Sequence, residues 1–188
     1  MEIVWCFDVS TAKQYDFNLN GVFSKIADAF PKELHLLKVT SQDLKDSFLQ
    51  GFSVIGFIDG EAVCHTRLIH LIDNWFELGG TYVCPEHRNQ QINHKMYRIF
   101  LPKHSEKDII ATTTNPASLR VGQDIGFVTI QRKRLPEEVW RASCTCPAKK
   151  IGTNNPEFCK LAFGKSTRET GLCYFRVTPE TAERHNLG

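Results

Sequence analysis

The residues between Asn74 and Phe127 constrain the fold more than any other part of the chain, because strand and helix patterns alternate there. A β-branched and aromatic run from Trp75 to Val83 predicts a strand that ends in a proline-containing turn. The stretch from Asp108 to Thr114, rich in Ile and Thr, predicts another strand. A helix pattern follows each strand, and the first places four apolar residues on one face: Ile92, Met96, Ile99 and Phe100. This order requires a crossover between parallel strands.

Turn and cap signals predict most of the remaining elements. Asn115 followed by Pro116 is a typical helix start, and that helix should stop near Gly126. Asp59-Gly60 predicts a hairpin between two β-rich runs. Further strands are expected over Glu2–Val9, Phe127–Arg132 and Cys173–Thr178, and further helices within Asp16–Phe30, Ser41–Leu49 and Pro136–Arg141. The predicted fold class is α/β (α+β), with a mixed central sheet of six to seven strands flanked by helices.

Two ordered motifs lie in the alternating region. The first has the form V-x-P-x-x-R and is made by Val83, Pro85 and Arg88. The second has the form N-x-x-S-x-x-V-x-x-x-x-G-F and is made by Asn115, Ser118, Val121, Gly126 and Phe127. In both, the chain resembles the GNAT superfamily of acetyl-CoA-dependent N-acetyltransferases. The resemblance implies a GNAT core over residues 1–134, a basic Cys-containing insertion over 135–172, and a last strand with the C-terminal tail over 173–188.

The resemblance also implies a cofactor site for acetyl-CoA. The turn before the first helix of the alternating region would hold the pyrophosphate, since a helix N-terminus presents unpaired N–H groups to an anion. The implied cofactor-binding residues are Tyr82, Val83, Arg88, Asn89, Gln90, Gln91, Ile92, Asn93, Asn115 and Ser118. The family usually has glycines where Gln91 and Asn93 stand, which allow the backbone to approach phosphate closely. Gln91 is the larger departure, because Asn tolerates left-handed dihedrals better.

The catalytic residues implied by the resemblance surround a glycine pair in the strand from Trp75 to Val83. Glycines inside a strand indicate a bulge or a close backbone approach, here at Gly79-Gly80. Glu77 precedes the pair and is the candidate general base, with His70 and His87 as rivals because histidine titrates near neutral pH. Ser118 is the candidate acid for the departing thiolate, with Tyr82 and Cys84 as alternatives. Gly122 stands where many family members have a tyrosine, and it cannot donate a proton.

The cysteines raise a separate question. The chain has seven, an odd number at irregular spacing, and its first fifteen residues include Asp8 where a signal peptide would be apolar. We therefore expect a reducing, cytoplasmic compartment and no membrane span. Cys144, Cys146, Cys159 and Cys173 could hold zinc in the insertion, although their spacings match no standard zinc finger. The alternative is a set of free or buried thiols.

Charge is distributed unevenly along the chain. Residues 1–130 carry 12 Lys and Arg against 15 Asp and Glu, whereas residues 131–170 carry 9 against 4. A basic segment could contact RNA, an acidic protein or a nucleotide phosphate, although such a bias is often only a solvated face. The resemblance to the GNAT superfamily implies transfer of an acetyl group from acetyl-CoA to a primary amine of a small molecule or protein N-terminus, by direct transfer in a ternary complex. The alternatives are a non-catalytic GNAT-like module that binds protein or RNA, and a small zinc-containing nucleic-acid binder.

Overall fold

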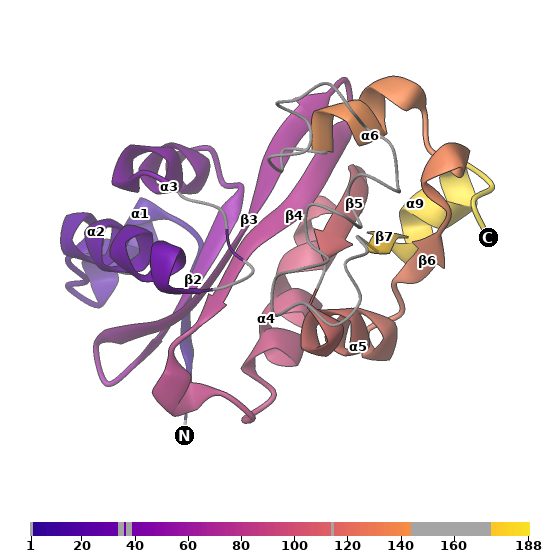
Figure 1. Ribbon diagram of the computed structural model, residues 1–188. Helices are drawn as coiled ribbons and strands as arrows, with labels where there is room; N and C mark the ends of the chain where they lie inside the picture. The colour runs from indigo at the N-terminus through magenta and orange to yellow at the C-terminus, as the bar shows by residue number, and fades with distance from the viewer. Residues whose placement is uncertain (1, 34–35, 37–38, 114, 144–173) are drawn as a thin grey trace. The chain divides into compact units, whose positions relative to one another are not determined.

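The computed structural model describes residues 2–33, 36, 39–113, 115–143 and 174–188 (Figure 1). Within these residues, seven strands form one mixed sheet in the order β1-β2-β3-β4-β5-β7-β6. The strands are β1 (Val4–Cys6), β2 (Ser53–Ile58), β3 (Glu61–Ile72), β4 (Trp75–Val83), β5 (Asp108–Thr113), β6 (Val128–Ile130) and β7 (Tyr174–Val177). The helices are α1 (Val9–Gln14), α2 (Leu19–Ala29), α3 (Ser41–Leu49), α4 (Ile92–Phe100), α5 (Pro116–Asp124), α6 (Glu137–Ser143) and α9 (Pro179–Arg184). The predicted fold class is confirmed.

The chain folds into two compact units. The first comprises Met1–Ile69 and Leu78–His104, and the second comprises His70–Glu77 and Ser105–Gly188. Strands β3 and β4 each contribute residues to both units.

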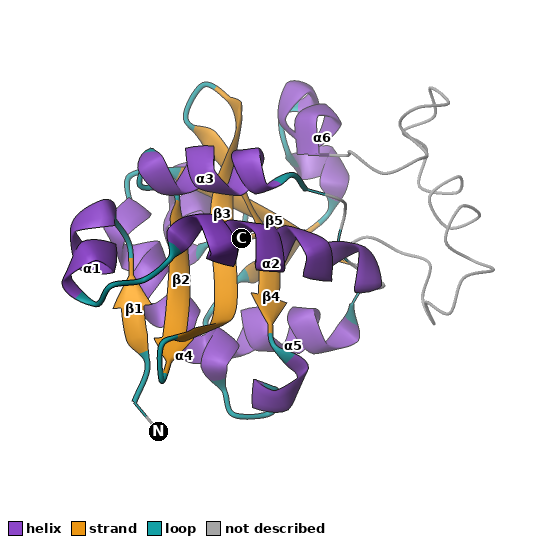
Figure 2. Ribbon diagram, turned by 90° about the vertical axis from the view of Figure 1, so that its left-hand side faces the viewer, coloured by secondary structure: helices purple, strands orange, loops and turns teal. Residues whose placement is uncertain are grey.

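In the first unit, β1, β2 and β3 pair antiparallel, and Asp59-Gly60 makes the predicted hairpin turn with φ values of +50° and +81°. Figure 2 shows α1, α2 and α3 on one side of these strands and α4 on the other. Helices α2 and α3 pack on the sheet through four aromatic and aliphatic side chains that are almost fully buried: Phe23, Ile26, Leu44 and Phe48. Helix α4 buries Ile92, Met96 and Phe100 of its predicted apolar face, whereas Ile99 is only partly buried and Tyr97 is buried as well.

The N-terminal segment differs from its predicted structure. The expected strand over Glu2–Val9 is shorter, because the Asp8 carboxylate accepts a hydrogen bond from the Thr11 N–H at 2.8 Å and starts α1. A left-handed residue, Asp16 at φ +55°, follows that helix, and Asn18 caps α2 by accepting from the Gly21 N–H at 3.1 Å. The helix predicted within Asp16–Phe30 is therefore confirmed as α2, whereas α1, which the Asp8 cap starts, was not predicted.

The second unit contains the crossover. Trp75, Phe76 and Glu77 of β4 pair in parallel with Asp108, Ile109 and Ile110 of β5. Asn115 starts α5 as predicted, since its side chain accepts from the Ala117 N–H at 2.9 Å. The predicted last strand is also confirmed, and β7 inserts antiparallel between β5 and β6. The core of this unit consists of Trp75, Ile110, Ile130, Leu135, Val139, Phe175, Val177, Ala182 and Leu187.

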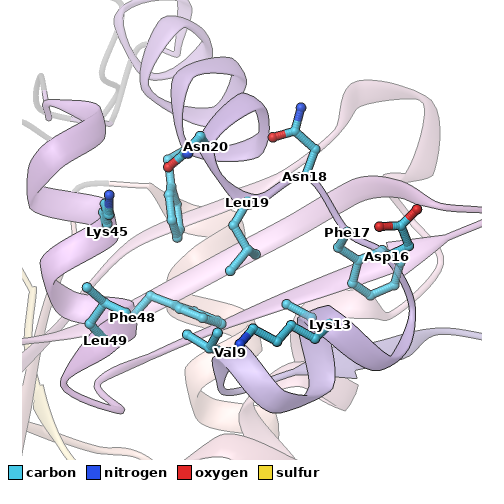
Figure 3. Close-up of a pocket in the computed structure, with 12 residues that line it drawn as sticks. Val9, Lys13, Asp16, Phe17, Asn18, Leu19, Asn20, Lys45, Phe48 and Leu49 are labelled. Atoms are coloured by element: carbon cyan, nitrogen blue, oxygen red, sulfur yellow. The ribbon is translucent and has the colours of Figure 1, made fainter.

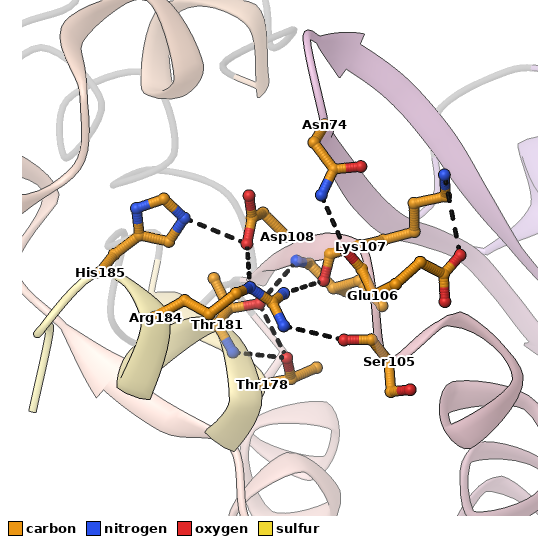
Figure 4. Close-up of polar contacts among 10 residues, drawn as sticks. Asn74, Ser105, Glu106, Lys107, Asp108, Thr178, Thr181, Arg184 and His185 are labelled. Carbon is orange, nitrogen blue, oxygen red and sulfur yellow. Dashed lines mark hydrogen bonds and ion pairs between the residues drawn. The ribbon is translucent and has the colours of Figure 1, made fainter.

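A polar cluster ties the C-terminal helix α9 to the beginning of β5 (Figure 4). The buried Asp108 carboxylate accepts from Arg184 Nε at 2.8 Å and lies 3.0 Å from His185 Nε2. The other Arg184 nitrogens donate to the carbonyls of Ser105 and Lys107. The Thr181 hydroxyl accepts from the Ile109 N–H at 2.8 Å. These contacts join residues more than seventy positions apart in sequence, so they hold the C-terminus in the fold.

No helix in the described part of the chain is long and apolar enough to cross a membrane.

Candidate functional site

The predicted site residues divide between the two units. Tyr82, Val83 and residues 88–93 lie in the first unit, whereas Glu77, Asn115 and Ser118 lie in the second. The four predicted zinc ligands, Cys144, Cys146, Cys159 and Cys173, lie outside the described residues. Among the described residues, no three His, Cys, Asp or Glu side chains gather as a metal site.

In the first unit, β4 leads into α4 through a tight turn. A single 3₁₀ turn over Pro85–His87 is closed by the Arg88 N–H donating to the Pro85 carbonyl at 3.3 Å. The first backbone bond of α4 then runs from the Lys95 N–H to the Gln91 carbonyl at 3.1 Å, and no side chain caps this end. The N–H groups of the first helical turn therefore point out of the helix end, where the dipole favours an anion.

Two residues of this turn adopt the left-handed conformation. Asn89 has a φ of +64°, and Gln91, at the N-cap of α4, has φ +56° and ψ +23°. Asn93, in contrast, lies within the helix. Gln91 therefore occupies a backbone conformation that favours glycine, and Asn93 does not. A non-glycine residue in this conformation costs roughly 1–2 kcal/mol. The strain at this loop thus falls on Gln91, the larger of the two departures from the family pattern.

Arg88 is held by the first unit itself. Its Nε donates to the Val83 carbonyl at 3.1 Å, and its Nη2 forms an ion pair with the Glu33 carboxylate. Within the described residues, Nη1 has no hydrogen-bond partner. The side chain is 43% exposed, so an anion at the turn can still reach it.

The glycine pair in β4 has the irregular backbone expected from the sequence. Gly80 has a φ of +59°, outside the extended region. Its carbonyl accepts from Nδ1 of His65, a fully buried ring on β3, and burial lowers the pKa of His65 to about 4. His65 is therefore a neutral structural group that holds this irregular strand. Thr66, Thr81 and Tyr97 link β3, β4 and α4 through hydroxyl bonds of 2.8 Å.

Glu77 lies in the second unit, on β4, facing Thr112 of β5. The Thr112 hydroxyl donates to Glu77 Oε1 at 2.6 Å. Burial raises the pKa of Glu77 from its usual 4.5 to about 7, and the bond from Thr112 opposes part of that rise. A carboxyl group that titrates near 7 can both take and return a proton at neutral pH. This property is the one that a general base requires.

The rival bases and acids are placed less favourably. His70 is exposed, and its Nε2 lies 2.9 Å from the Asp73 carbonyl. This contact explains His70 as a residue that stabilises the turn between β3 and β4. His87 ends the 3₁₀ turn before α4. The Tyr82 hydroxyl donates to Cys84 Sγ at 3.7 Å, and burial together with Cys84 raises the pKa of Tyr82. Glu77, in contrast, is a partly buried carboxyl group that is bonded to Thr112.

Ser118 lies on α5, and a buried arginine that the sequence did not single out holds this helix. Arg176 of β7 is 5% exposed, donates from Nη1 to the Ser118 carbonyl at 2.7 Å and lies over the Phe127 ring. A Cβ atom on Gly122 would lie 2.0 Å from Arg176 Nη1. The arginine therefore occupies the space above Gly122. No local pattern indicates this contact, because Arg176 is 58 residues from Ser118 in sequence.

A groove of about 370 Å³ lies among α1, α2 and α3 of the first unit, and none of its lining residues is a predicted site residue (Figure 3). Apolar and polar side chains both contribute to its lining. The lining residues are Val9, Ala12, Lys13, Asp16, Phe17, Asn18, Leu19, Asn20, Phe23, Lys45, Phe48 and Leu49.

The comparison with solved structures identifies the fold. N-Acetylglutamate synthase from Neisseria gonorrhoeae, solved with coenzyme A and N-acetyl-glutamate, has a TM-score of 0.57 at 13% identity, over 94% of this chain and 35% of that protein. Rv2747 from Mycobacterium tuberculosis, solved with CoA, has a TM-score of 0.60 at 14% identity, over 93% of this chain and 98% of that protein. A GNAT-family acetyltransferase from Staphylococcus aureus has a TM-score of 0.53 at 16% identity, over 94% of this chain and 99% of that protein.

No family model matches the chain, and no curated protein matches its sequence significantly. The chain therefore has the GNAT fold, as its two motifs predicted, and identities this low establish the fold alone.

Proposed function

We propose that the protein is an N-acetyltransferase that moves an acetyl group from acetyl-CoA to a primary amine. The observation that carries this proposal is Glu77, a carboxyl group with a pKa of about 7 on the fourth strand of a GNAT fold. Structures of the same fold, such as the Neisseria synthase and Rv2747, were solved with CoA, which supports acetyl-CoA as the cosubstrate.

The turn before α4 fits the pyrophosphate of acetyl-CoA. Its left-handed residues, Asn89 and Gln91, turn the backbone so that the open N–H groups of α4 are presented together. Arg88 adds a positive charge whose Nε and Nη2 are already held, so little side-chain entropy remains to be lost on binding. Tyr82, Val83, Gln90, Ile92 and Asn93 complete the proposed cofactor-binding set of this unit.

Glu77 acts in this proposal as the general base. It accepts a proton from the ammonium form of the acceptor, either directly or through a water, and the free amine attacks the thioester carbonyl. The carbon–sulfur bond then breaks and the amide bond forms. Ser118 is the proposed donor of a proton to the leaving thiolate, and Asn115 and Ser118 are the proposed contacts of the thiol arm. Glu77 suits its role because Thr112 fixes one carboxylate oxygen and burial disfavours the charged form.

Thermal melting with and without acetyl-CoA tests the proposal first. A ligand at 100 times its dissociation constant should stabilise the protein by roughly 2.7 kcal/mol. Arg88→Gln should weaken acetyl-CoA binding about tenfold, because a charge-assisted bond to phosphate contributes about 1.5–3 kcal/mol. Gln is preferable to Glu at this position, since Glu would bring a second carboxylate beside Glu33 and confuse affinity with folding.

The matched control is Arg98→Gln, which removes the same charge from an exposed position in the last turn of α4. Calorimetry should give wild-type affinity for that variant. Equal affinity in the wild type, Arg88→Gln and Arg98→Gln would remove the turn from the cofactor site. No stabilisation by acetyl-CoA would instead favour the non-catalytic module that binds protein or RNA through the basic segment 131–170.

A further inference from the structure

Arg67 is a partly buried cation of the first unit, and it forms no ion pair with a carboxylate among the described residues. It extends from β3, and its Nη1 donates to the Asp43 carbonyl and to the Ser47 hydroxyl, both at 3.3 Å. These bonds are long for N–H···O contacts. Its Nε is buried without a hydrogen-bond partner. Its Nη2 has no partner among the described residues and is not buried, so this nitrogen is open to solvent.

The Asp43 carboxylate does not form an ion pair with Arg67, although the Asp43 carbonyl accepts a bond from it. The Asp43 carboxylate instead accepts from the Thr40 hydroxyl at 2.7 Å and from the Thr40 N–H at 3.0 Å, in the capping box that starts α3. The effect of Asp43 on Arg67 is therefore electrostatic and acts at a distance, whereas burial lowers the pKa of Arg67. A guanidinium removed from water without a counterion is costly, and a bound anion would offset that cost.

The position of Arg67 connects it with the irregular part of β4. A Cβ atom on Gly80 would lie 3.5 Å from Arg67 Nε and 3.3 Å from the Phe30 ring. His65, on the same strand as Arg67, donates to the Gly80 carbonyl at 3.0 Å. Arg67 thus lies beside the point where the backbone of β4 departs from the extended conformation. In a GNAT acetyltransferase that strand faces the reacting acetyl group, so this part of the inference rests on the proposed function.

We propose that the Arg67 guanidinium binds a carboxylate of the acetyl acceptor, and that the substrates are amines that carry a carboxylate. A carboxylate can reach Nη2, whereas Nε is buried and Nη1 is bonded to α3, and the guanidinium keeps its positive charge at any pH of the assay. Arg176, which holds α5, makes a short bond of 2.7 Å to the Ser118 carbonyl. Arg67 makes no bond that short within the described residues, since both of its bonds to α3 are 3.3 Å.

The first test compares acceptors. L-Amino acids and their α-amides are assayed with acetyl-CoA by release of the CoA thiol, for the wild type and for Arg67→Gln, Arg67→Lys and Arg98→Gln. The wild type and Arg98→Gln should prefer the carboxylate series in kcat/KM by about 10- to 100-fold, as expected for one charge-assisted contact. Arg67→Gln should lose that preference by a rise in KM, and Arg67→Lys should recover part of it. An equal rate for both series in the wild type would overturn the proposal.

The second test needs no knowledge of the acceptor. Acetate is titrated into nitrogen-15-labelled protein at constant ionic strength, while the Nε–H resonance of Arg67 is followed by NMR. Acetamide, which has the same shape but no charge, is the control ligand. Acetate should shift the resonance in a saturable way and acetamide should not, and Arg67→Lys identifies the resonance by its loss. Absence of any acetate-specific shift would overturn the proposal even if no amine of the first test is acetylated.

The two proposals fail in different ways. Calorimetry with acetyl-CoA reports on the proposed function without involving Arg67. Binding and acetylation without a carboxylate preference would leave the acetyltransferase and remove the Arg67 subsite. If Arg67→Gln lowers the rates of both acceptor series equally, together with the midpoint of urea unfolding, the role of Arg67 is structural and the subsite is removed as well.

Discussion

Replacing Glu77 by Gln should change how the stability of the protein depends on pH. The pKa of Glu77 is about 7 in the folded protein against an ordinary value of 4.5, so the folded state binds this proton more tightly than the unfolded state. At 1.36 kcal/mol per pH unit, that difference corresponds to about 3 kcal/mol. The contribution of the Glu77 proton is fully present below pH 4.5 and is lost as the pH rises through about 7.

The measurement is a series of urea unfolding curves for the wild type and Glu77→Gln between pH 4 and pH 8.5. The Gln variant has no proton to lose, so its stability relative to the wild type should rise by about 3 kcal/mol across this range. The same titration should appear in catalysis: kcat of the wild type should increase with pH through about 7, and Glu77→Gln should lower it by about 10²–10⁴-fold.

Thr112→Val is the control, because it changes the pKa of the Glu77 carboxyl group without removing that group. The bond from Thr112 lowers the pKa of Glu77, so its loss should move both pH midpoints upward. Parallel stability curves for the wild type and Glu77→Gln would show that this carboxyl group titrates normally. Turnover of Glu77→Gln within a factor of about two of the wild type would separately remove Glu77 from the role of general base.

Three further substitutions test the local geometry. Gln91→Gly should stabilise the protein by about 1 kcal/mol in urea unfolding, since glycine relieves the left-handed strain, and an unchanged midpoint would show that Gln91 is unstrained. Gly122→Ala should cost about 1–3 kcal/mol despite its better helix propensity, because the new methyl meets the Arg176 guanidinium; a gain in stability would contradict the packing described here. Asp108→Asn should lower the free energy of unfolding by about 1–3 kcal/mol, because it leaves the partly exposed Arg184 without its carboxylate. A loss below about 0.5 kcal/mol would show that the polar cluster around Asp108 contributes little to stability.

The sequence alone determined the order of most elements and many of their ends, although helices α1 and α9 were not predicted. Asn115 with Pro116 starts α5 and Asp59-Gly60 closes the hairpin, because each conformation depends on a side chain and its immediate neighbours. The apolar spacing of α4 likewise predicted the face that it buries. The two GNAT motifs predicted the fold because they consist of residues that form local turns and helix caps. At the N-terminus, periodicity predicted α2 but missed the short helix α1, which the Asp8 cap starts.

Only the tertiary structure decided the chemical properties of the candidate site. The pKa of Glu77 depends on burial and on Thr112, which is 35 residues away in sequence. The space above Gly122 is filled by Arg176 from β7, and Arg67 lies beside Gly80 because β3 and β4 bring them together. Desolvation and charge pairing depend on every group within a few ångströms, whatever its position in the chain. A sequence names the residues that can titrate or bind, and their packing decides which of them do.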